Sequence, residues 1–529
     1  MNGKLVKLMM KNNQMNVLMK GAMLLTIASF ISKVLSAAYR VPFQNMVGNI
    51  GFYVYQQVYP IYGIGTALTL SGLPVLISRL IAKQSNLDDK LALTKQIFKL
   101  LATFGIIVFI LLNLFAVNIA MLMGDIRLHS GISAISWMFL IMPFLATGRG
   151  YFQGNMNMLP TAYSQTIEQV IRVSIILGVA YLYTKGLFNP YTMSKYAMLS
   201  VVIAGLFAML VLLYFTRKHG FTFNHSRNVI PYNKLIKIIT LEGGTICLAS
   251  SIMVLMQLID SFTLRKNLVN FGMSNLASQM SKGIYDRAQP MVQLGLVIGM
   301  AFASALLPTL VLNKNNRTIF NKILSNVMHI SLTLTAAVAV GMLSLMPLIN
   351  TVLFGDSQGS YVIGVYCLSI IFATLIIVYS SVLQSRGNFK IILFSILVGI
   401  IIKIILTKLM VVHLGMLGGS LSTLMALMLA FETSWLLSKN YINIKIFSFK
   451  YFYKLLLNLI VMYSFEVLSL KMFSAYIDFS DHRLISLLIL MLLATLGATL
   501  YLTITVKFRL LTVDELSTIP FLGKYLKNE

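Results

Sequence analysis

Lys33 and Arg40 are cations within the first long apolar stretch of the chain, residues 21–43. Their spacing is about two turns of an α-helix, so both side chains project from the same side of one helix. A charge in hydrocarbon is costly unless it faces a wet cavity, a counter-charge or an anionic ligand. We therefore predict that Lys33 and Arg40 bind an anionic substrate. Snorkelling to the lipid headgroups is the alternative for Arg40, which precedes Pro42 near the end of the stretch.

Asp286 and Arg287 open a later apolar stretch. Adjacent residues on a helix cannot face each other, so each needs a partner from elsewhere. Pro290 follows within a turn, frees a backbone carbonyl and can kink the helix. Charges at a helix break are frequent at transporter sites, so we predict that Asp286 and Arg287 bind substrate. The alternative is that both are loop charges at the outer surface.

Lys403 lies in the middle of the apolar stretch 389–412, without a partner that the sequence identifies. Its position predicts an aqueous or headgroup-lined path, and we assign it to the substrate site. Within the expected spans, basic residues outnumber the two acidic residues that we count there, Glu168 and Glu432. This excess of positive charge suits an anionic ligand such as phosphate. The span cations are Lys33, Arg40, Arg172, Lys403 and Lys408.

Glu168 and Arg172 are four residues apart in the stretch 161–183, with Gln165 on the same helix side. This spacing predicts a pair that neutralises itself and locks the helix. Asp260, with Arg265 after it, is expected to form either an outer gate or an exposed ion pair. The residues assigned to structural or gating roles are Arg149, Gln165, Glu168, Arg172 and Asp260.

The composition is that of a membrane protein. Of 529 residues, 58% are hydrophobic and 11% are charged. A soluble domain carries about 25% charged residues, so these charges are too few to cover a soluble globule of this size. Apolar runs of about 20 residues recur along the chain, and they predict an all-α polytopic membrane protein.

The net charge of +27 comes largely from short loops between apolar runs. We therefore expect anionic phospholipid, and no nucleic acid, to be the partner of these loops. Cys247 and Cys367 lie in apolar segments and are expected to be buried without a disulfide. The six histidines have no metal-ligand spacing, so no metal or other cofactor is expected.

We predict about 14 transmembrane helices: two six-helix lobes and two C-terminal helices. The N-lobe (21–216) and C-lobe (238–438) are joined by a cytoplasmic loop (217–237), and the last two helices lie within 451–506. Residues 1–20 and 507–529 are expected to be a basic leader and a cytoplasmic tail. Two short motifs, Leu73-Pro74 with Leu307-Pro308 and Phe152-Gln153-Gly154 with Leu383-Gln384-Ser385, recur at nearly equal offsets and favour parallel lobes. The expected spans are 21–43, 53–80, 96–123, 132–150, 161–183, 193–216, 238–260, 283–312, 323–353, 361–384, 389–412, 416–438, 451–474 and 484–506.

With the amino terminus inside, 28 cations fall on the cytoplasmic side and 9 on the other side. This asymmetry predicts that both termini are cytoplasmic. No nucleophile elbow, phosphate-binding loop, zinc motif or paired-carboxylate arrangement is visible, so we expect a transporter and not an enzyme. The alternatives are a drug/cation antiporter, which would need buried carboxylates such as Glu168 and Asp260, and a membrane glycosyltransferase or polymerase. The longest expected outer loop, 261–282, is short for such an enzyme.

Several motifs resemble the polysaccharide-biosynthesis branch of the multidrug/oligosaccharidyl-lipid/polysaccharide exporter superfamily, which includes MurJ-like lipid flippases and stage V sporulation protein B. The resemblance covers most of the chain. Its motifs are Ser32-Lys33-Val34-Leu35, Tyr59-Pro60-Ile61-Tyr62, Ser71-Gly72-Leu73-Pro74, the block from Arg149 to Gln169, Asp286-Arg287 and Leu383-Gln384-Ser385-Arg386-Gly387-Asn388.

The resemblance implies fourteen helices in two lobes and a bacterial plasma-membrane location. It implies a flippase that moves a polyprenyl-pyrophosphate-linked saccharide by alternating access through a cationic central cavity. A lipid-linked oligosaccharide would be the substrate, and cell-envelope biosynthesis enzymes would be further partners. Lys33 stands where the family has an arginine, and a cavity arginine expected near Ile64 is absent. That departure leaves open whether lipid II is the substrate.

Overall fold

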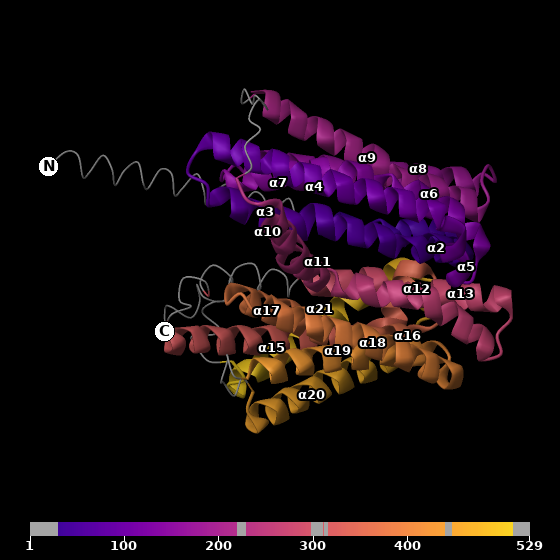
Figure 1. Ribbon diagram of the computed structural model, residues 1–529. Coiled ribbons are helices and arrows are strands. Elements are labelled where there is room, and N and C mark those ends of the chain that lie inside the picture. Colours follow the sequence, from indigo (N-terminus) through magenta and orange to yellow (C-terminus); the bar gives the residue numbers. More distant parts are fainter. Residues whose placement is uncertain (1–29, 219–228, 298–309, 311–315, 440–446, 512–529) are drawn as a thin grey trace. The chain divides into compact units, whose positions relative to one another are not determined.

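The computed structural model describes residues 30–218, 229–297, 310, 316–439 and 447–511. The chain divides into two compact units, Met1–Phe262 and Thr263–Glu529. The described part is helical throughout (Figure 1), which confirms the expected all-α class. The division falls within one helix, whereas the predicted lobes divide at residues 217–237. The predicted lobe boundaries stay a prediction.

The first unit packs helices that are consecutive in sequence and helices that are distant in sequence. α8 lies against α9, α3 and α4 both pack against α7, and α2 contacts α8 and α9. The elements are α2 (Arg40–Thr66), η1 (Ala67–Gly72), α3 (Leu73–Ala82), α4 (Leu87–Leu114), α5 (Ala116–Leu122), η2 (Ile126–Leu128), α6 (His129–Ser136), α7 (Met138–Gly154), α8 (Leu159–Thr184), α9 (Pro190–Lys218), α10 (Tyr232–Lys237), η3 (Ile238–Gly243), α11 (Gly244–Ser250) and α12 (Ile252–Asn270), the last of which continues into the second unit.

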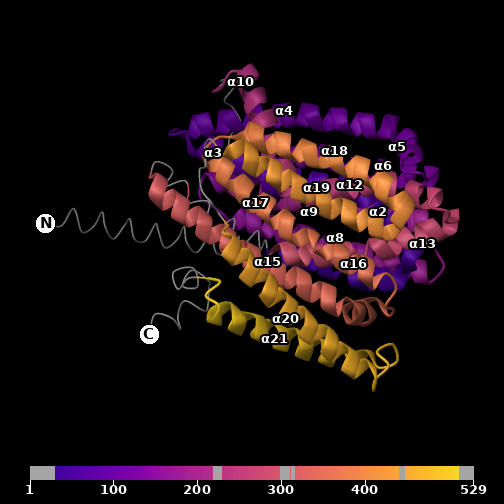
Figure 2. The ribbon, with the colours of Figure 1, turned by 90° about the horizontal axis from the view of Figure 1, so that it is seen from below.

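In the second unit, α18 packs along α19, and α20 and α21 pack against each other and against α15 (Figure 2). Side-chain caps start two of these helices, since Asn316 accepts a hydrogen bond from the backbone of Ile319 and Ser448 accepts one from Tyr451. The elements are α13 (Asn275–Tyr285), α15 (Arg317–Phe354), α16 (Ser360–Cys367), α17 (Ser369–Ser385), α18 (Phe389–Leu414), α19 (Met416–Ser438), α20 (Phe449–Ser474) and α21 (Arg483–Lys507).

Within the described residues, 11 helices are long and apolar enough to cross a membrane, or 12 if the pair Tyr232–Ser250 and Ile252–Asn270, bent by 76°, forms one span. These helices make the protein a multi-pass membrane protein. Residues 30–43 of the predicted span 21–43 and the whole predicted span 53–80 fall in one helical stretch, Phe30–Ala82, and residues 21–29 lie outside the described residues. Gly48 breaks that stretch, because its backbone (φ 66°, ψ −176°) is open only to glycine. The predicted span 283–312 lies partly outside the described residues, and the count of about 14 stays a prediction.

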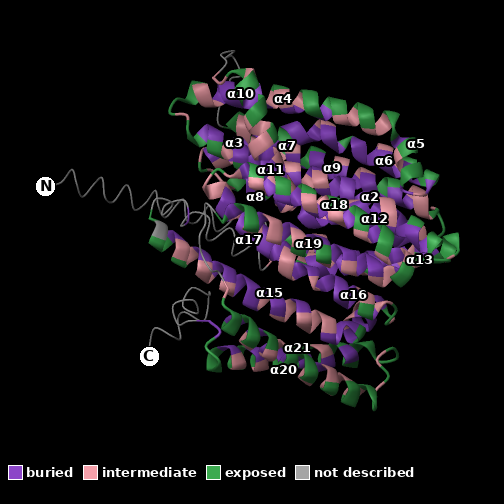
Figure 3. Cartoon of the chain, turned by 60° about the horizontal axis from the view of Figure 1, so that its bottom comes forward, coloured by how far each residue is buried: buried purple, intermediate pink, exposed green. Residues whose placement is uncertain are grey.

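Burial follows the expectation for helices in lipid. α20 and α21 expose much of their apolar surface (Figure 3), whereas a connected core of aliphatic and aromatic side chains fills the first unit. Cys247 and Cys367 are both buried and unpaired, which confirms that they act as small hydrophobic residues. The membrane-facing surface therefore carries little polar chemistry, and the polar residues gather inside the units.

Small residues let neighbouring helices approach closely, as is usual between helices in lipid. A Cβ atom at Gly418 would overlap the backbone of Met410, at the junction of α18 and α19. At Gly178, in α8, a Cβ atom would meet nothing within 4 Å. Gly418 is therefore required by packing, and Gly178 is not.

Replacing Gly418 by alanine is expected to destabilise the protein by about 1–3 kcal/mol, because the added methyl group has no space against rigid backbone. Gly178→Ala is the matched control, and it is expected to be neutral or slightly stabilising, since alanine is the better helix former. Thermal unfolding in detergent checks both. Equal melting temperatures for the two variants would contradict the packing assigned to Gly418.

Candidate functional site

Arg40 is the first residue of α2 and is 0% exposed. Its guanidinium carbon lies 4.1 Å from the centroid of the Tyr59 ring. None of its three guanidinium nitrogens has a hydrogen-bond partner among the described residues. A buried charge normally has hydrogen bonds or a counter-ion, whereas among the described residues Arg40 has a cation–π contact with Tyr59 in their place. The snorkelling alternative for Arg40 is wrong, since the side chain is buried inside the unit.

Arg172, on α8, lies in the same cluster. One nitrogen, Nη2, donates to Gln169 Oε1 at 2.6 Å and to Ser36 Oγ at 3.1 Å. Its guanidinium also lies 4.7 Å from the Tyr62 ring and 5.2 Å from the Tyr39 ring. The other two nitrogens, Nε and Nη1, are buried and have no hydrogen-bond partner in the described part of the chain. Arg172 therefore also keeps unused donors.

Tyrosines surround these two arginines. Tyr55, Tyr59 and Tyr62 follow one another at helical spacing on α2, and their rings are in contact along the helix. The hydroxyl of Tyr39 lies 2.7 Å from the hydroxyl of Tyr55. We call Tyr39, Arg40, Tyr55, Tyr59, Tyr62 and Arg172 the arginine–tyrosine cluster. It presents unused guanidinium donors and no carboxylate, so its chemistry suits an oxyanion.

Glu168 pairs with Arg149 and not with Arg172. Arg149 Nη2 lies 2.5 Å from Glu168 Oε2, and both side chains are almost fully buried. Arg149 also donates to Ser164 Oγ and to the backbone oxygen of Thr69. The predicted pair within the helix is therefore wrong, because α7 brings a closer cation to the carboxylate. Arg149 joins α7, α8 and η1 and keeps Glu168 away from Arg172.

The other predicted residues of the first unit lie as follows. Lys33 is exposed and lies in the helical segment before Tyr39. Gln165 and Asp260 are buried, at 6% and 0% exposure. Arg265, in the second unit, is 8% exposed, so the alternative of an exposed Asp260–Arg265 pair is wrong.

Asp286 is neutralised locally. α13 ends at Tyr285, Asp286 and Arg287 form a turn, and the chain is helical again from Ala288. Lys282 Nζ donates to both carboxylate oxygens of Asp286 at 2.6 Å, and both side chains are 0% exposed. The helix break at these residues is confirmed, and the alternative that they are surface charges is wrong.

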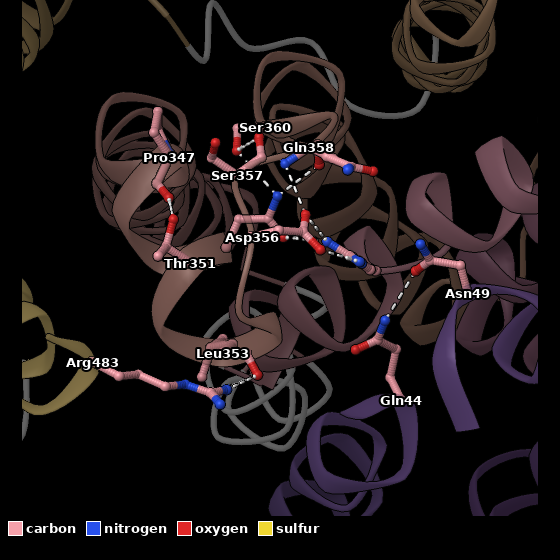
Figure 4. Close-up of polar contacts among 12 residues, drawn as sticks. Gln44, Asn49, Pro347, Thr351, Leu353, Asp356, Ser357, Gln358, Ser360 and Arg483 are labelled. Atoms are coloured by element: carbon pink, nitrogen blue, oxygen red, sulfur yellow. Dashed lines mark hydrogen bonds and ion pairs between the residues drawn. The ribbon is translucent and has the colours of Figure 1, made fainter. Parts of the chain in front are cut away.

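Arg287 finds its partner 69 residues away. Its Nη1 and Nη2 donate to the two oxygens of Asp356 at 2.7 and 2.9 Å, and Nη1 lies 3.3 Å from Asn350 Oδ1. Asp356 belongs to the short loop between α15 and α16, beside Ser357, Gln358 and Ser360 (Figure 4). The structure thus confirms that Asp286 and Arg287 have separate partners, and it compensates the charge of Arg287 with a carboxylate.

Opposing effects set the pKa of Asp356. Partial burial disfavours the charged form, but hydrogen bonds from Arg287 and from the backbone nitrogen of Gln358, together with the charge of Arg287, outweigh it. The pKa of Asp356 is consequently below its ordinary value. Asp356 is therefore ionised at neutral pH and available to Arg287.

Lys403 is fully buried, and its ammonium group is enclosed by α19. Its Nζ lies 2.7 Å from Thr423 Oγ1, 3.0 Å from Ser422 Oγ and 3.2 Å from the backbone oxygen of Gly419. An ammonium group has three donors, so these three oxygens can satisfy it. The structure therefore fixes Lys403 between α18 and α19 in its own unit.

Sequence reasoning missed Lys282 and Asp356 as counter-ions and the tyrosines as a cation–π surface. The spacing of Tyr55, Tyr59 and Tyr62 was a usable signal, because it places the three rings on one helix face. Glu466 was also missed as an acid within an expected span, 451–474.

Glu168→Gln is expected to destabilise the protein by about 3–5 kcal/mol, because it leaves the buried charge of Arg149 without its counter-ion. The control is Glu242→Gln, which breaks the partly exposed pair with Arg79 and should cost about 0–1 kcal/mol. Chemical or thermal unfolding of both variants checks this. Equal losses of stability would contradict the structural role of the Arg149–Glu168 pair.

The depressed pKa of Asp356 predicts that its ion pair with Arg287 contributes to the stability of the folded protein and that this contribution is lost in acid. Because its pKa in the folded protein is depressed, this contribution is complete above the ordinary aspartate pKa of about 3.9 and disappears as the pH falls through the folded value. Asp356→Asn should remove this part of the pH dependence. The measurement is the melting temperature against pH, with the exposed Asp481→Asn as control. Identical profiles for wild type and Asp356→Asn would refute the prediction.

Comparisons with known proteins agree with this architecture. The profile of the family described as "Polysaccharide biosynthesis protein" matches residues 18–314. The membrane protein YabM of Bacillus subtilis is 37% identical over 410 residues, covering 76% of each chain. Lipid II flippase MurJ of the same organism is 22% identical over 517 residues, which cover 92% of this chain and 94% of MurJ.

A solved structure of lipid II flippase MurJ, in an inward closed conformation, shares the fold with a TM-score of 0.67. Its sequence identity is 17%, and the alignment covers 90% of this chain and 98% of that one. The predicted resemblance is confirmed, and the chain belongs to the polysaccharide biosynthesis protein family.

Proposed function

We propose that this protein is a flippase that moves a polyprenyl-pyrophosphate-linked saccharide across the bacterial plasma membrane, with its arginine–tyrosine cluster binding the phosphate groups. Such a lipid-linked oligosaccharide is a precursor of cell wall or surface polysaccharide. Membership of a polysaccharide biosynthesis family and the similarity to a lipid II flippase support this class of substrate. The observation that carries the proposal is Arg40, whose three buried guanidinium nitrogens have no hydrogen-bond partner among the residues that the structure describes.

The buried guanidinium group of Arg40 lowers the stability of the folded protein. Leaving a guanidinium group buried without hydrogen bonds costs several kcal/mol, and a cation–π contact returns only about 0.5–2 kcal/mol. A residue with this cost is retained where a ligand supplies the missing acceptors. Phosphate oxygens are the acceptors that match guanidinium geometry best, since they accept parallel, charge-assisted bonds.

The cluster favours a pyrophosphate over a simple carboxylate. Arg40 and Arg172 together hold five nitrogen atoms without partners in the described part of the chain, which exceeds what one carboxylate can accept. Lys33, exposed on the preceding helical segment, adds a third cation near the same end of α2. The saccharide would lie beyond the phosphates, and the polyprenyl tail would remain in lipid.

Arg287 and Lys403 take a different place in this proposal. Asp356 compensates the charge of Arg287, and oxygen atoms of α19 bind the ammonium group of Lys403. In this proposal the phosphate groups therefore bind mainly to Arg40 and Arg172 in the first unit. Alternating access through a cationic cavity between the two lobes, with both termini cytoplasmic, remains the predicted mechanism. Cell-envelope enzymes and anionic phospholipid remain predicted partners.

The drug/cation antiporter alternative has less support. It needs a carboxylate at the substrate site that exchanges a cation for a proton: Glu168 is held by Arg149 at 2.5 Å, and the second candidate, Asp260, is not part of the arginine–tyrosine cluster. A glycosyltransferase or polymerase would need acid–base residues at one site, and the arginine–tyrosine cluster contains no carboxylate. The cluster therefore favours transport of an anion.

Depletion of the protein in its native host is the direct test. Lipid-linked saccharides are extracted and measured by mass spectrometry, and we expect the polyprenyl-linked intermediate to accumulate. Complementation with Arg40→Met should fail, with transport reduced at least about tenfold, since each lost charge-assisted bond is worth about 1.5–3 kcal/mol. Unchanged lipid-linked pools on depletion would refute the proposal.

The melting temperature distinguishes a variant that has lost substrate binding from one that has lost its fold. Arg40→Met removes an uncompensated buried charge, so its melting temperature should be equal to or higher than that of the wild type. Arg79→Gln is the matched control, because Arg79 is partly exposed and already paired with Glu242, and it should complement fully. An Arg40→Met protein that is stable and also complements would exclude Arg40 from the substrate site.

A further inference from the structure

Glu466 is a buried carboxyl group that the proposed function does not use. It lies on α20 and is 2% exposed. Glycines on both neighbouring helices leave room for it: a Cβ atom at Gly341, on α15, would lie 3.8 Å from both carboxyl oxygens, and one at Gly497, on α21, would overlap the carboxyl group. The three helices therefore enclose the carboxyl group in a space that a larger neighbour would fill.

The hydrogen bonding of Glu466 is incomplete for a charged group. The hydroxyl of Ser344, on α15, donates to Glu466 Oε2, and it is the only hydrogen-bond donor to Glu466 among the described residues. No described cation pairs with Glu466. An ionised carboxylate has about four acceptor positions, so one neutral hydroxyl leaves most of its charge uncompensated. Burial in this setting favours the protonated, neutral form.

The charged and titratable groups of the packed helices have other contacts. His329 stacks on Tyr451 at 4.6 Å, Arg483 donates to the backbone oxygens of Val352 and Leu353, and the Tyr501 hydroxyl donates to the backbone oxygen of Thr333. No side chain that the structure describes on α15 or α21 forms an ion pair with Glu466. The full set is Arg317, Lys322 and His329 on α15, Arg483, Tyr501 and Lys507 on α21, and Lys450, Tyr451, Tyr453, Lys454, Tyr463 and Lys471 on α20.

A cavity of about 830 Å³ connects Ser344 with the surface of the second unit. Ser344 and Tyr463 belong to its wall, and Tyr361 and Tyr476, which are 68% and 87% exposed, belong to its rim. Other polar groups line it as well, and Figure 4 shows Asp356, Ser357 and Ser360 around the loop that borders it. A cavity of this size has room for water, and Ser344, the hydrogen-bond partner of Glu466, belongs to its lining.

The geometry points to a proton-binding site: we propose that Glu466 takes up and releases a proton through the water of this cavity. In uptake, a hydronium ion of the cavity water transfers its proton to a carboxylate oxygen and leaves a water molecule. In release, the same O–H bond breaks toward water. Asp356, Asp478 and Lys471 are the charged groups that line the route. This site goes beyond the proposed function, because it does not depend on which substrate is moved.

Protonation of Glu466 links pH to helix packing. The neutral carboxyl fits between Gly341 and Gly497, whereas the ionised form demands hydration that this contact excludes. Ionisation should therefore favour a looser arrangement of α15, α20 and α21 in which cavity water reaches the carboxylate. The site would make that rearrangement dependent on pH.

Infrared spectroscopy of the full-length protein in nanodiscs tests the site. We expect a carbonyl band of a protonated carboxylic acid that persists above the pH at which exposed carboxylates ionise, and the loss of that band in Glu466→Gln. Identical titration spectra for wild type and Glu466→Gln would overturn the proposal. A titration midpoint that falls when sodium replaces potassium at constant ionic strength would also overturn it, because a metal cation would then occupy the carboxylate.

Two further variants keep the test decisive if Glu466→Gln does not fold. Ser344→Ala removes the donor that stabilises the charged form, so it should shift the titration midpoint upward, and an unchanged midpoint would contradict the assignment. Ser344→Cys tests water access with a membrane-impermeant thiol reagent, with Ser357→Cys on the rim as positive control and the buried Cys247 and Cys367 of the wild type as background. Labelling of Ser357→Cys but not of Ser344→Cys would exclude the proposed route.

Discussion

A buried cation in an apolar helical protein must be compensated, and the two units of this protein meet that requirement differently. In the second unit, Lys282 and Arg287 each have a carboxylate, and Lys403 has three oxygens of α19. In the first unit, Arg40 has aromatic rings around it and unused donors. Lys282, Arg287 and Lys403 of the second unit are therefore compensated within that unit, whereas Arg40 in the first unit carries positive charge that a ligand can compensate.

The Arg149–Glu168 pair maintains this difference. Arg149 occupies the one carboxylate close to Arg172 and uses its remaining donors on Ser164 and on the backbone of η1. If Glu168 instead paired with Arg172, the arginine–tyrosine cluster would lose much of its net charge. A structural ion pair thus protects a functional cation, and the tyrosines hold the arginines in place without neutralising them.

The sequence was sufficient for the fold class, the family and the presence of charges that needed compensation. Apolar runs of about 20 residues identify membrane helices regardless of tertiary contacts. The Asp286-Arg287-x-x-Pro290 pattern was sufficient for a helix break, because adjacent charges cannot pair and proline disturbs the backbone. These are local properties, and local sequence determines them.

The partners of the charges could not be predicted in the same way. Arg287 and Asp356 are 69 residues apart, and which carboxylate approaches which cation depends on how whole helices pack. The i, i+4 rule suggested that Glu168 pairs with Arg172 on α8, but a second helix, α7, supplies Arg149 as the partner of Glu168. The role of Gly48 was equally hidden: it lies in the expected connection between the spans 21–43 and 53–80, and its left-handed backbone conformation could not be predicted from the sequence.

The most direct measurement of the central claim is the thermal stabilisation of the purified protein by a short-chain polyprenyl pyrophosphate. The matched ligand is the corresponding polyprenol, which lacks the phosphates. If uncompensated arginines in the first unit bind the phosphates, the pyrophosphate should raise the melting temperature of the wild type, the polyprenol should not, and Arg40→Met should abolish the difference. An equal rise for Arg40→Met and wild type would contradict the account.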